Sequence, residues 1–567
     1  MLIIILRLIG IIAAIATAVM GLKSSGPKHR YFLLAILLLL LQGIPQGFDV
    51  FKPDLSEETI RKIAETTKDI LLEAQHSKKI LNDTENDELR RLAEKGLEEE
   101  ARAEKIATAI QQGYEEAAKQ YAEATLRAIK YYRQGLSANP KTSERCALYN
   151  LIGIAHYRIS QLNEAADAWE ESARLAGELI SDEENSEEEQ IALAIAVGNL
   201  GIVYKTRGDL KLAEEMHLKA LKINEELGRK VGMASNYGNL GLVYGTRGDL
   251  DRAEEMHLKA LKINEELGRK VGMASNYGNL GLVYGTRGDL NRAEEMHLKS
   301  LEIEKSLGHK KGMASDYGNL GNVYQIRGDL DKAEEMYQKA LKIHDEMGNK
   351  EGVASDYSNL GNVYQTRGDL KKAEEMYQKA LEINKELGCK EGMAIQRGNL
   401  GVLYKTRGDL NKAEEMYQKA LEINEELGRK EGMANHYGNL GNVYQIRGDL
   451  KKAEEMYLKS LEINEELGSK EGMANQYGNL GNVFGIRGDL NRAEEMYQKA
   501  LKINEELGRK EGMAIQYGNL GIVYKTSGDL KKAEEYYRQA LTLYREVGAE
   551  PKIEWAIERL KEIGVEP

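Results

Sequence analysis

From residue 191 onward, apolar and small residues recur at three- and four-residue spacing in alternating stretches, as on one face of a helix. In residues 229–248 this stripe consists of Met233, Tyr237, Leu240, Gly241 and Tyr244. In residues 250–268 it consists of Ala253, Met256, His257, Ala260, Leu261, Ile263 and Leu267. Gly248 can end the first helix, Asp249 can cap the second, and Gly268 can end it. The pattern predicts an antiparallel helix pair that buries its stripes only against neighbouring pairs.

The predicted pair repeats every 40 residues, and residues 213–250 are identical to residues 253–290. The period is marked by Gly201, Gly241, Gly281, Gly321, Gly361, Gly401, Gly441, Gly481 and Gly521. A divergent first copy is centred on Gly153, and an acidic tract at 181–190 lengthens the step to the next copy to 48 residues. We therefore expect a degenerate first unit at 140–190, nine 40-residue units at 191–548 and a capping helix at 549–567.

These residues carry a family resemblance. Tyr237, Leu240, Gly241, Tyr244, Gly248, Ala253, His257 and Ala260 resemble the pattern of the tetratricopeptide repeat (TPR), in its long, 40-residue form. The resemblance implies an all-α fold, a right-handed α-solenoid of about ten TPR helix pairs. It also implies a concave groove, lined by the first helices, that binds protein or peptide partners.

The N-terminal 48 residues have a different pattern. Residues 2–22 are apolar apart from Arg7 and Thr17, and as a helix they would span roughly 31 Å, enough for a bilayer core. A shorter apolar run at 32–44 follows a loop with three basic residues, and such loops stay in the cytoplasm. We expect residues 1–48 to be a membrane anchor of one or two spans, with the repeats outside the cytoplasm, in the periplasm. The opposite topology would place the repeats on the cytoplasmic face.

Residues 49–137 are predicted to form a helical stalk. Ile60, Ile63, Thr67, Ile70, Ala74 and Leu81 lie near the spacing of a coiled-coil seam. A coiled-coil seam would support self-association, whereas a solvated spacer would not. The pattern leaves both alternatives open.

Composition excludes other classes of function. The net charge is −12, which disfavours nucleic acid as a partner because phosphate binding needs a basic surface. The two cysteines, Cys146 and Cys389, cannot form a disulfide framework. No catalytic constellation is evident beyond what the repeat explains. We therefore expect neither enzymatic activity nor a cofactor.

Two recurring motifs suggest specific chemistry. Arg-Gly-Asp occurs eight times, first at 207–209, and could be an adhesion signal. Each copy falls in a predicted turn, where Gly supplies the positive φ and Asp the N-cap. His217, His257 and His297 share a position that later units fill with Tyr337 or its equivalents, so a packing role is favoured over a metal site.

An asparagine precedes Leu-Gly in every full unit. These ladder asparagines are Asn199, Asn239, Asn279, Asn319, Asn359, Asn399, Asn439, Asn479 and Asn519. Four units carry a second asparagine three residues later, where the other units have Ile, Leu or Val. These paired asparagines are Asn322, Asn362, Asn442 and Asn482.

In TPR relatives, asparagine at both positions contacts the backbone of an extended peptide. Amides suit that role because each one both donates and accepts hydrogen bonds. The ladder asparagines could instead tie neighbouring units together. The sequence thus predicts a non-enzymatic, membrane-anchored scaffold with a peptide-binding groove. A structural spacer in an envelope complex and a cytoplasmic signalling adaptor are the alternatives.

Overall fold

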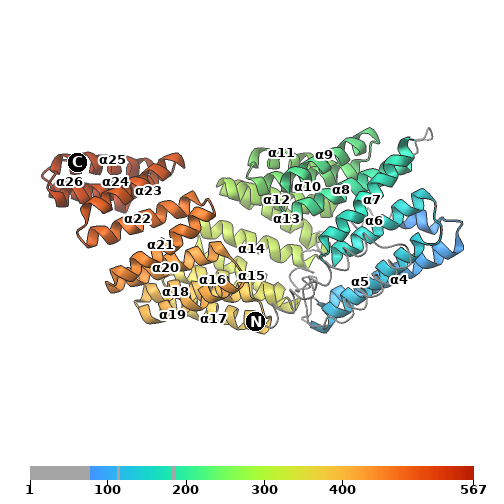
Figure 1. The fold of residues 1–567 in the computed structure, drawn as a ribbon, viewed down its shortest axis with the longest axis horizontal. Coiled ribbons are helices and arrows are strands. Elements are labelled where there is room, and N and C mark those ends of the chain that lie inside the picture. Colours follow the sequence, from blue (N-terminus) through green and yellow to red (C-terminus); the bar gives the residue numbers. More distant parts are fainter. Residues whose placement is uncertain (1–76, 111–114, 182–186) are drawn as a thin grey trace, which may run out of the picture. The chain divides into compact units, whose positions relative to one another are not determined.

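A computed structural model describes residues 77–110, 115–181 and 187–567, and the secondary structure of this part is helical throughout (Figure 1). The chain divides into two compact units, with the boundary between residues 223 and 224, inside α9. The predicted anchor, 1–48, and the predicted seam up to Ala74 lie outside the described residues. Within the described residues, no helix combines the length and the apolar character needed to cross a bilayer.

The first unit contains helices that pack in sequence along the chain. They are α4 (Asp87–Ile110), α5 (Glu115–Leu136), α6 (Thr142–Arg158), α7 (Leu162–Ser181), α8 (Glu187–Thr206) and α9 (Leu210–Glu226), the last of which crosses the boundary. A Cβ on Gly96 of α4 would lie 2.2 Å from the ring of Tyr132 in α5, and one on Gly153 of α6 would lie 2.5 Å from Trp169 in α7. The same glycine-on-aromatic contact thus joins both pairs. The described helices of the predicted stalk therefore pack as a repeat-like pair that shares a core with α6.

The second unit consists of helix pairs and a last helix. The first helices of the pairs are α10 (Lys230–Arg247), α12 (Lys270–Arg287), α14 (Lys310–Arg327), α16 (Lys350–Arg367), α18 (Lys390–Arg407), α20 (Lys430–Arg447), α22 (Lys470–Ile486) and α24 (Lys510–Ser527). The second helices are α11 (Leu250–Glu266), α13 (Leu290–Leu307), α15 (Leu330–Glu346), α17 (Leu370–Glu386), α19 (Leu410–Glu426), α21 (Leu450–Glu466), α23 (Leu490–Glu506) and α25 (Leu530–Val547). The chain is an all-α helical-repeat solenoid, as the 40-residue period predicts.

The pair α10–α11 shows how the sequence fixes the repeat. Leu240 and Tyr244 are buried, as the stripe predicts. Gly248 has φ 84°, and the Asp249 carboxylate accepts a hydrogen bond from the backbone N–H of Arg252 at 3.2 Å. The predicted turn and N-cap are therefore confirmed. Leu267 departs from the prediction: it is 39% exposed because it follows the last helical residue, and Asn264 is buried instead.

A polar clasp joins successive pairs. The Tyr284 hydroxyl in α12 donates to Oε1 of Glu254 in α11 at 2.6 Å, and Nη1 of Arg287 donates to Oε2 of the same carboxylate at 2.5 Å. Burial raises the pKa of Glu254, but these hydrogen bonds outweigh burial and hold the pKa below its usual value. Equivalent clasps recur along the array, for example at Glu334 and Glu374. The arginine of the Arg-Gly-Asp triplet therefore links units, while its aspartate caps a helix.

The last helix, α26 (Glu550–Glu562), covers the end of the array. Ala556 and Leu560 are fully buried, and Trp555 contacts Tyr537 edge-on with ring centroids 6.1 Å apart. A Cβ on Gly518 would lie 3.0 Å from Trp555, whereas the equivalent Gly478 faces Gln516 of the next first helix. Trp555 therefore takes the place that the side chain of a following unit has elsewhere in the array.

Candidate peptide groove

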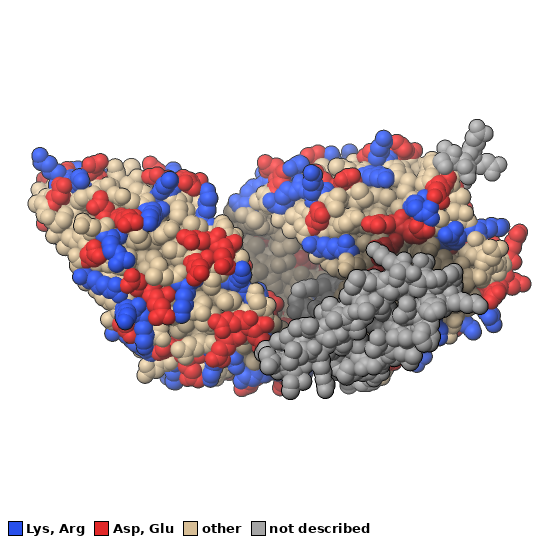
Figure 2. Space-filling view, in the orientation of Figure 1, with Lys and Arg blue, Asp and Glu red and all other residues tan. Residues whose placement is uncertain are grey.

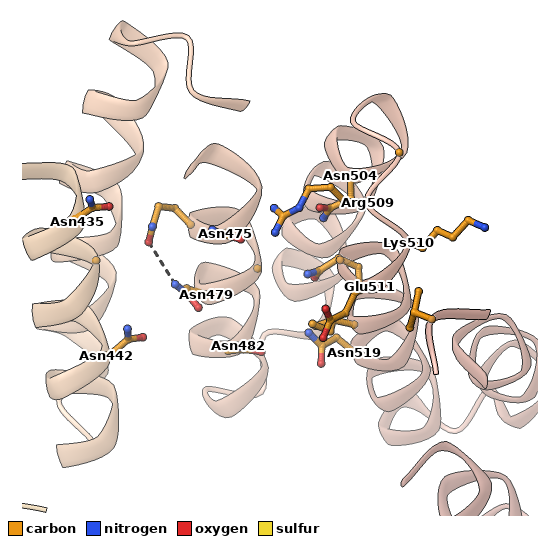
Figure 3. A pocket seen from close by; sticks show the side chains of 18 of the residues that line it. Asn435, Asn442, Asn475, Asn479, Asn482, Asn504, Arg509, Lys510, Glu511 and Asn519 are labelled. Carbon is orange, nitrogen blue, oxygen red and sulfur yellow. Dashed lines mark hydrogen bonds between the residues drawn. The ribbon is translucent and has the colours of Figure 1, made fainter. Parts of the chain in front are cut away.

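The first helices α20, α22 and α24 provide most of the lining of an open groove of about 1070 Å³, named here the amide groove. Its lining includes ten side-chain amides: Asn435, Asn439, Asn442, Asn475, Gln476, Asn479, Asn482, Asn504, Gln516 and Asn519. Figure 3 shows Asn435 and Asn442 on one helix and Asn475, Asn479 and Asn482 on the next. Because helix residues three and four apart share a face, the sequence places these amides on the same side of each helix. Five residues of the predicted binding set thus lie together here.

The ladder asparagines differ in their surroundings. Asn199 is buried, and its Nδ2 donates to Oδ1 of Asn150 at 3.2 Å, which joins α8 to α6. Asn479 donates to Oε1 of Gln476 in its own helix at 3.3 Å. The others are partly exposed, and among the described residues their side chains have no hydrogen-bond partner: Asn239, Asn279, Asn319, Asn359, Asn399, Asn439 and Asn519. Asn199 therefore ties neighbouring units together, as the alternative interpretation expects. Most ladder asparagines instead have side-chain amides that make no hydrogen bond within the described structure.

The paired asparagines have a partner inside the repeat that the sequence reading missed. Oδ1 of Asn482 accepts a hydrogen bond from the hydroxyl of Tyr497, which is 5% exposed, at 2.8 Å. The same bond joins Tyr337 to Asn322, Tyr377 to Asn362 and Tyr457 to Asn442, at 2.6, 2.7 and 2.8 Å. The Nδ2 groups of these four asparagines donate to no atom of the described chain. The tyrosine therefore orients each amide with its donor unused.

Units that lack the second asparagine show the complementary arrangement. Val402 and Ile522 occupy its position, and the buried hydroxyls of Tyr417 and Tyr537 in those units have no partner in the described structure. Where the second helix carries His257 or His297 instead of tyrosine, the position holds Leu242 or Leu282. The second asparagine therefore occurs only in units that carry a tyrosine fifteen positions later, although two such units lack it.

A second row of polar residues was also missed. Three residues before every ladder asparagine except Asn199 stands a buried polar side chain: Asn236, Asn276, Asp316, Asp356, Gln396, His436, Gln476 or Gln516. Gln476 and Gln516 line the amide groove, and Oε1 of Gln516 has no partner in the described part of the chain. A polar residue at this one position of eight consecutive units, beside an apolar stripe, was the signal that could have identified the row.

Charge is confined to one end of the amide groove. Arg509, Lys510 and Glu511 line it at the start of α24, and Nη2 of Arg509 lies 3.0 Å from Oε1 of Glu471. None of the lining residues contributed by α20 and α22 is charged. On the outer surface, by contrast, acidic and basic side chains are interspersed over the helices in view (Figure 2). The part of the amide groove formed by α20 and α22 is thus uncharged on a highly charged protein.

The remaining candidate motifs have structural roles. His257 is 1% exposed, and a Cβ on Gly241 would lie 2.6 Å from its ring, so the position packs a flat ring as predicted. The described residues contain no group of three or more His, Cys, Asp or Glu side chains arranged for a metal ion. Cys146 is buried and Cys389 partly buried, and neither forms a disulfide bond within the described part of the chain. Arg397, which stands at the position that Tyr237 holds in its own unit, donates to the backbone carbonyl of Lys419 at 3.4 Å.

The profile of the tetratricopeptide repeat family matches residues 191–266, 232–306, 312–386, 393–466 and 472–546, which together exceed half of the chain. The chain belongs to the tetratricopeptide repeat family. The TPR resemblance inferred from the sequence is therefore confirmed. No curated protein matches the chain.

Several solved structures are similar to this TPR protein. BtubC (BKLC) from P. vanneervenii is 28% identical over 39% of this chain and 90% of its own, with a TM-score of 0.35. The apo quorum sensor NprR from B. thuringiensis is 16% identical over 60% and 99%, with a TM-score of 0.45. The STAND protein PH0952 from Pyrococcus horikoshii, which has a tetratricopeptide repeat sensor, is 15% identical over 78% and 72%, with a TM-score of 0.49. Since these TM-scores are below 0.5, they carry no inference about function.

Proposed function

We propose that this TPR protein is a non-enzymatic scaffold that binds an extended segment of a protein partner in the groove formed by its first helices. The observation that carries the proposal is the amide groove, where ten side-chain amides converge on one cavity. A peptide backbone presents alternating N–H and C=O groups, and amides match both without requiring a charge. Asn439 and Asn519 offer both groups, while Asn442 and Asn482 offer a donor.

The proposal includes the N-terminal segment. Residues 1–48 would anchor the scaffold in a membrane, and the basic loop at 21–30 would keep the repeats outside the cytoplasm. The support for this part is the hydropathy and charge of the sequence. The groove and the anchor can fail separately, so they are tested separately.

The groove is tested by site-specific photo-crosslinking in cells. A photoreactive amino acid at Asn479 should yield a discrete cross-linked partner, and the same group at Leu458, on the exposed side of α21, should not. Substitution of Asn439 and Asn519 by Ala should weaken the cross-link, because each lost amide contact costs about 1 kcal/mol. Equal yields from both positions, or no product from Asn479, would contradict groove binding and favour a structural spacer.

A further inference from the structure

Two exposed isoleucines follow the paired asparagines of the amide groove on α20 and α22. Ile446 and Ile486 are each 61% exposed, and each lies one helical turn beyond a paired asparagine on the same helix face. Ile326, at the equivalent position of an earlier unit, is 68% exposed. Most other units carry threonine there, for example Thr366, Thr406 and Thr526. The repeat fold therefore does not require isoleucine at this position.

The neutral lining limits what can bind beside these isoleucines. A charged peptide side chain placed against α20 and α22 would lose hydration without gaining an oppositely charged partner. This loss of hydration costs free energy. Unused Nδ2 donors on Asn442 and Asn482 favour backbone carbonyl groups, and the unpartnered Oε1 of Gln516 favours a donor such as a backbone N–H. The chemistry thus matches an uncharged peptide segment.

The repeat geometry sets the spacing of the side chains that would reach the isoleucines. Adjacent first helices contact through Gly438 and Gln476, so their axes lie about 10 Å apart. A peptide in the polyproline II conformation that crosses them advances about 3.1 Å per residue, and its side chains three residues apart lie on the same face. Side chains three residues apart would therefore face successive units.

Resting on the proposed function, we propose that the amide groove selects an uncharged, extended peptide segment with apolar side chains three residues apart, which pack on Ile446 and Ile486. The asparagines hold the backbone, and the isoleucines supply side-chain specificity. Charge complementarity supports this occupant over an acidic or basic peptide, because the charged residues that line the groove are confined to the start of α24.

The probe is a phage-displayed library of random 12-residue peptides, selected on the full-length protein. Selected peptides should lack charged residues in their centre and carry apolar residues at a spacing of three. When made synthetically, such peptides should bind Ile446→Thr and Ile486→Thr about tenfold more weakly each, since apolar burial is lost. Ile326→Thr is the matched control and should leave affinity unchanged, because no residue of its helix, α14, lines the amide groove.

The outcomes separate this inference from the proposed function. Selected peptides that are charged, or that bind the two threonine variants normally but lose affinity with Asn439→Ala and Asn479→Ala, would overturn the isoleucine proposal and retain the groove. Selection of no peptide, or of peptides insensitive to all these substitutions, would overturn both. Circular dichroism should show unchanged helix content in each threonine variant, because other units already carry threonine there.

Discussion

The bond between Asn482 and Tyr497 offers a sharp test of how the repeat is built. Asn482→Val installs the residue that Val402 already supplies at the same position of another unit. Tyr497 has Gly485, not glutamine, opposite its hydroxyl, and among the described residues Asn482 is its only hydrogen-bond partner. The substitution should therefore leave a buried hydroxyl unpaired, with little change in packing volume.

The free-energy cost of this substitution follows from the burial of the Tyr497 hydroxyl. Tyr497 is 5% exposed, and burial raises the pKa of its hydroxyl above the usual value, so the group stays neutral and needs an acceptor. Leaving a buried hydroxyl unsatisfied costs about 1 to 3 kcal/mol. Tyr497→Phe together with Asn482→Val removes both partners, and this double variant should recover most of that loss. Tyr497→Phe alone should cost less than Asn482→Val alone.

Hydrogen exchange read by mass spectrometry suits the assay, because repeat arrays open locally rather than all at once. Proteolytic peptides that contain Phe484 can be assigned to this unit, because the neighbouring units have tyrosine at the equivalent position. Amide exchange in α22 and α23 should accelerate about fivefold to a hundredfold in Asn482→Val and return toward wild type in the double variant. Equal acceleration in the single and double variants would refute the reasoning, since the hydroxyl would then not be the source of the loss.

Further predictions address the array, its pH response and its topology. Deletion of residues 251–290 should leave a folded solenoid, because the new junction reproduces the sequence at 289–291; wholesale loss of helix in circular dichroism would contradict this. Burial lowers the pKa of His257 and of His436 to about 4, so between pH 6.5 and 4 the unfolded chain binds protons that the folded chain does not. Stability should therefore fall as pH falls through this window, and His436→Gln, which copies Gln476, should reduce the slope in denaturant titrations. Alkaline phosphatase fused at residue 60 should be active and green fluorescent protein dark, and the reverse would place the repeats in the cytoplasm.

The helix pairs of the repeats were predictable because their signals are local. A stripe at helical spacing, a glycine with positive φ and an aspartate cap lie within one unit, and Gly248 and Asp249 behave as their neighbours in sequence require. The pair α4–α5 was not predictable in this way. Gly96 and Tyr132 lie 36 residues apart, whereas Gly153 and Trp169 lie 16 apart, so no period connects the two pairs.

The candidate site was only partly predictable. The asparagines could be found because they recur, but their hydrogen bonds depend on residues of the following helix. In the sequence, Asn322 follows Leu320 and Gly321 and looks like a surface residue that the fold does not need. Its hydrogen bond with Tyr337 shows that it has a structural role. Leu242 and Leu282 are therefore poor guides to replacing a paired asparagine, because their units carry histidine in place of tyrosine.

The paired asparagines also show why the amide groove lies where it does. Two consecutive units carry Asn322 and Asn362, and two others carry Asn442 and Asn482, each bound to a tyrosine. Beside the first two, the buried polar row holds the acidic residues Asp316 and Asp356, and Oδ2 of Asp356 lies 2.6 Å from Nδ1 of His344. Beside the second two, the row holds His436 and Gln476. Because a buried carboxylate needs a partner of its own while a glutamine can turn either a donor or an acceptor toward a ligand, the neutral row favours peptide binding at Asn442 and Asn482.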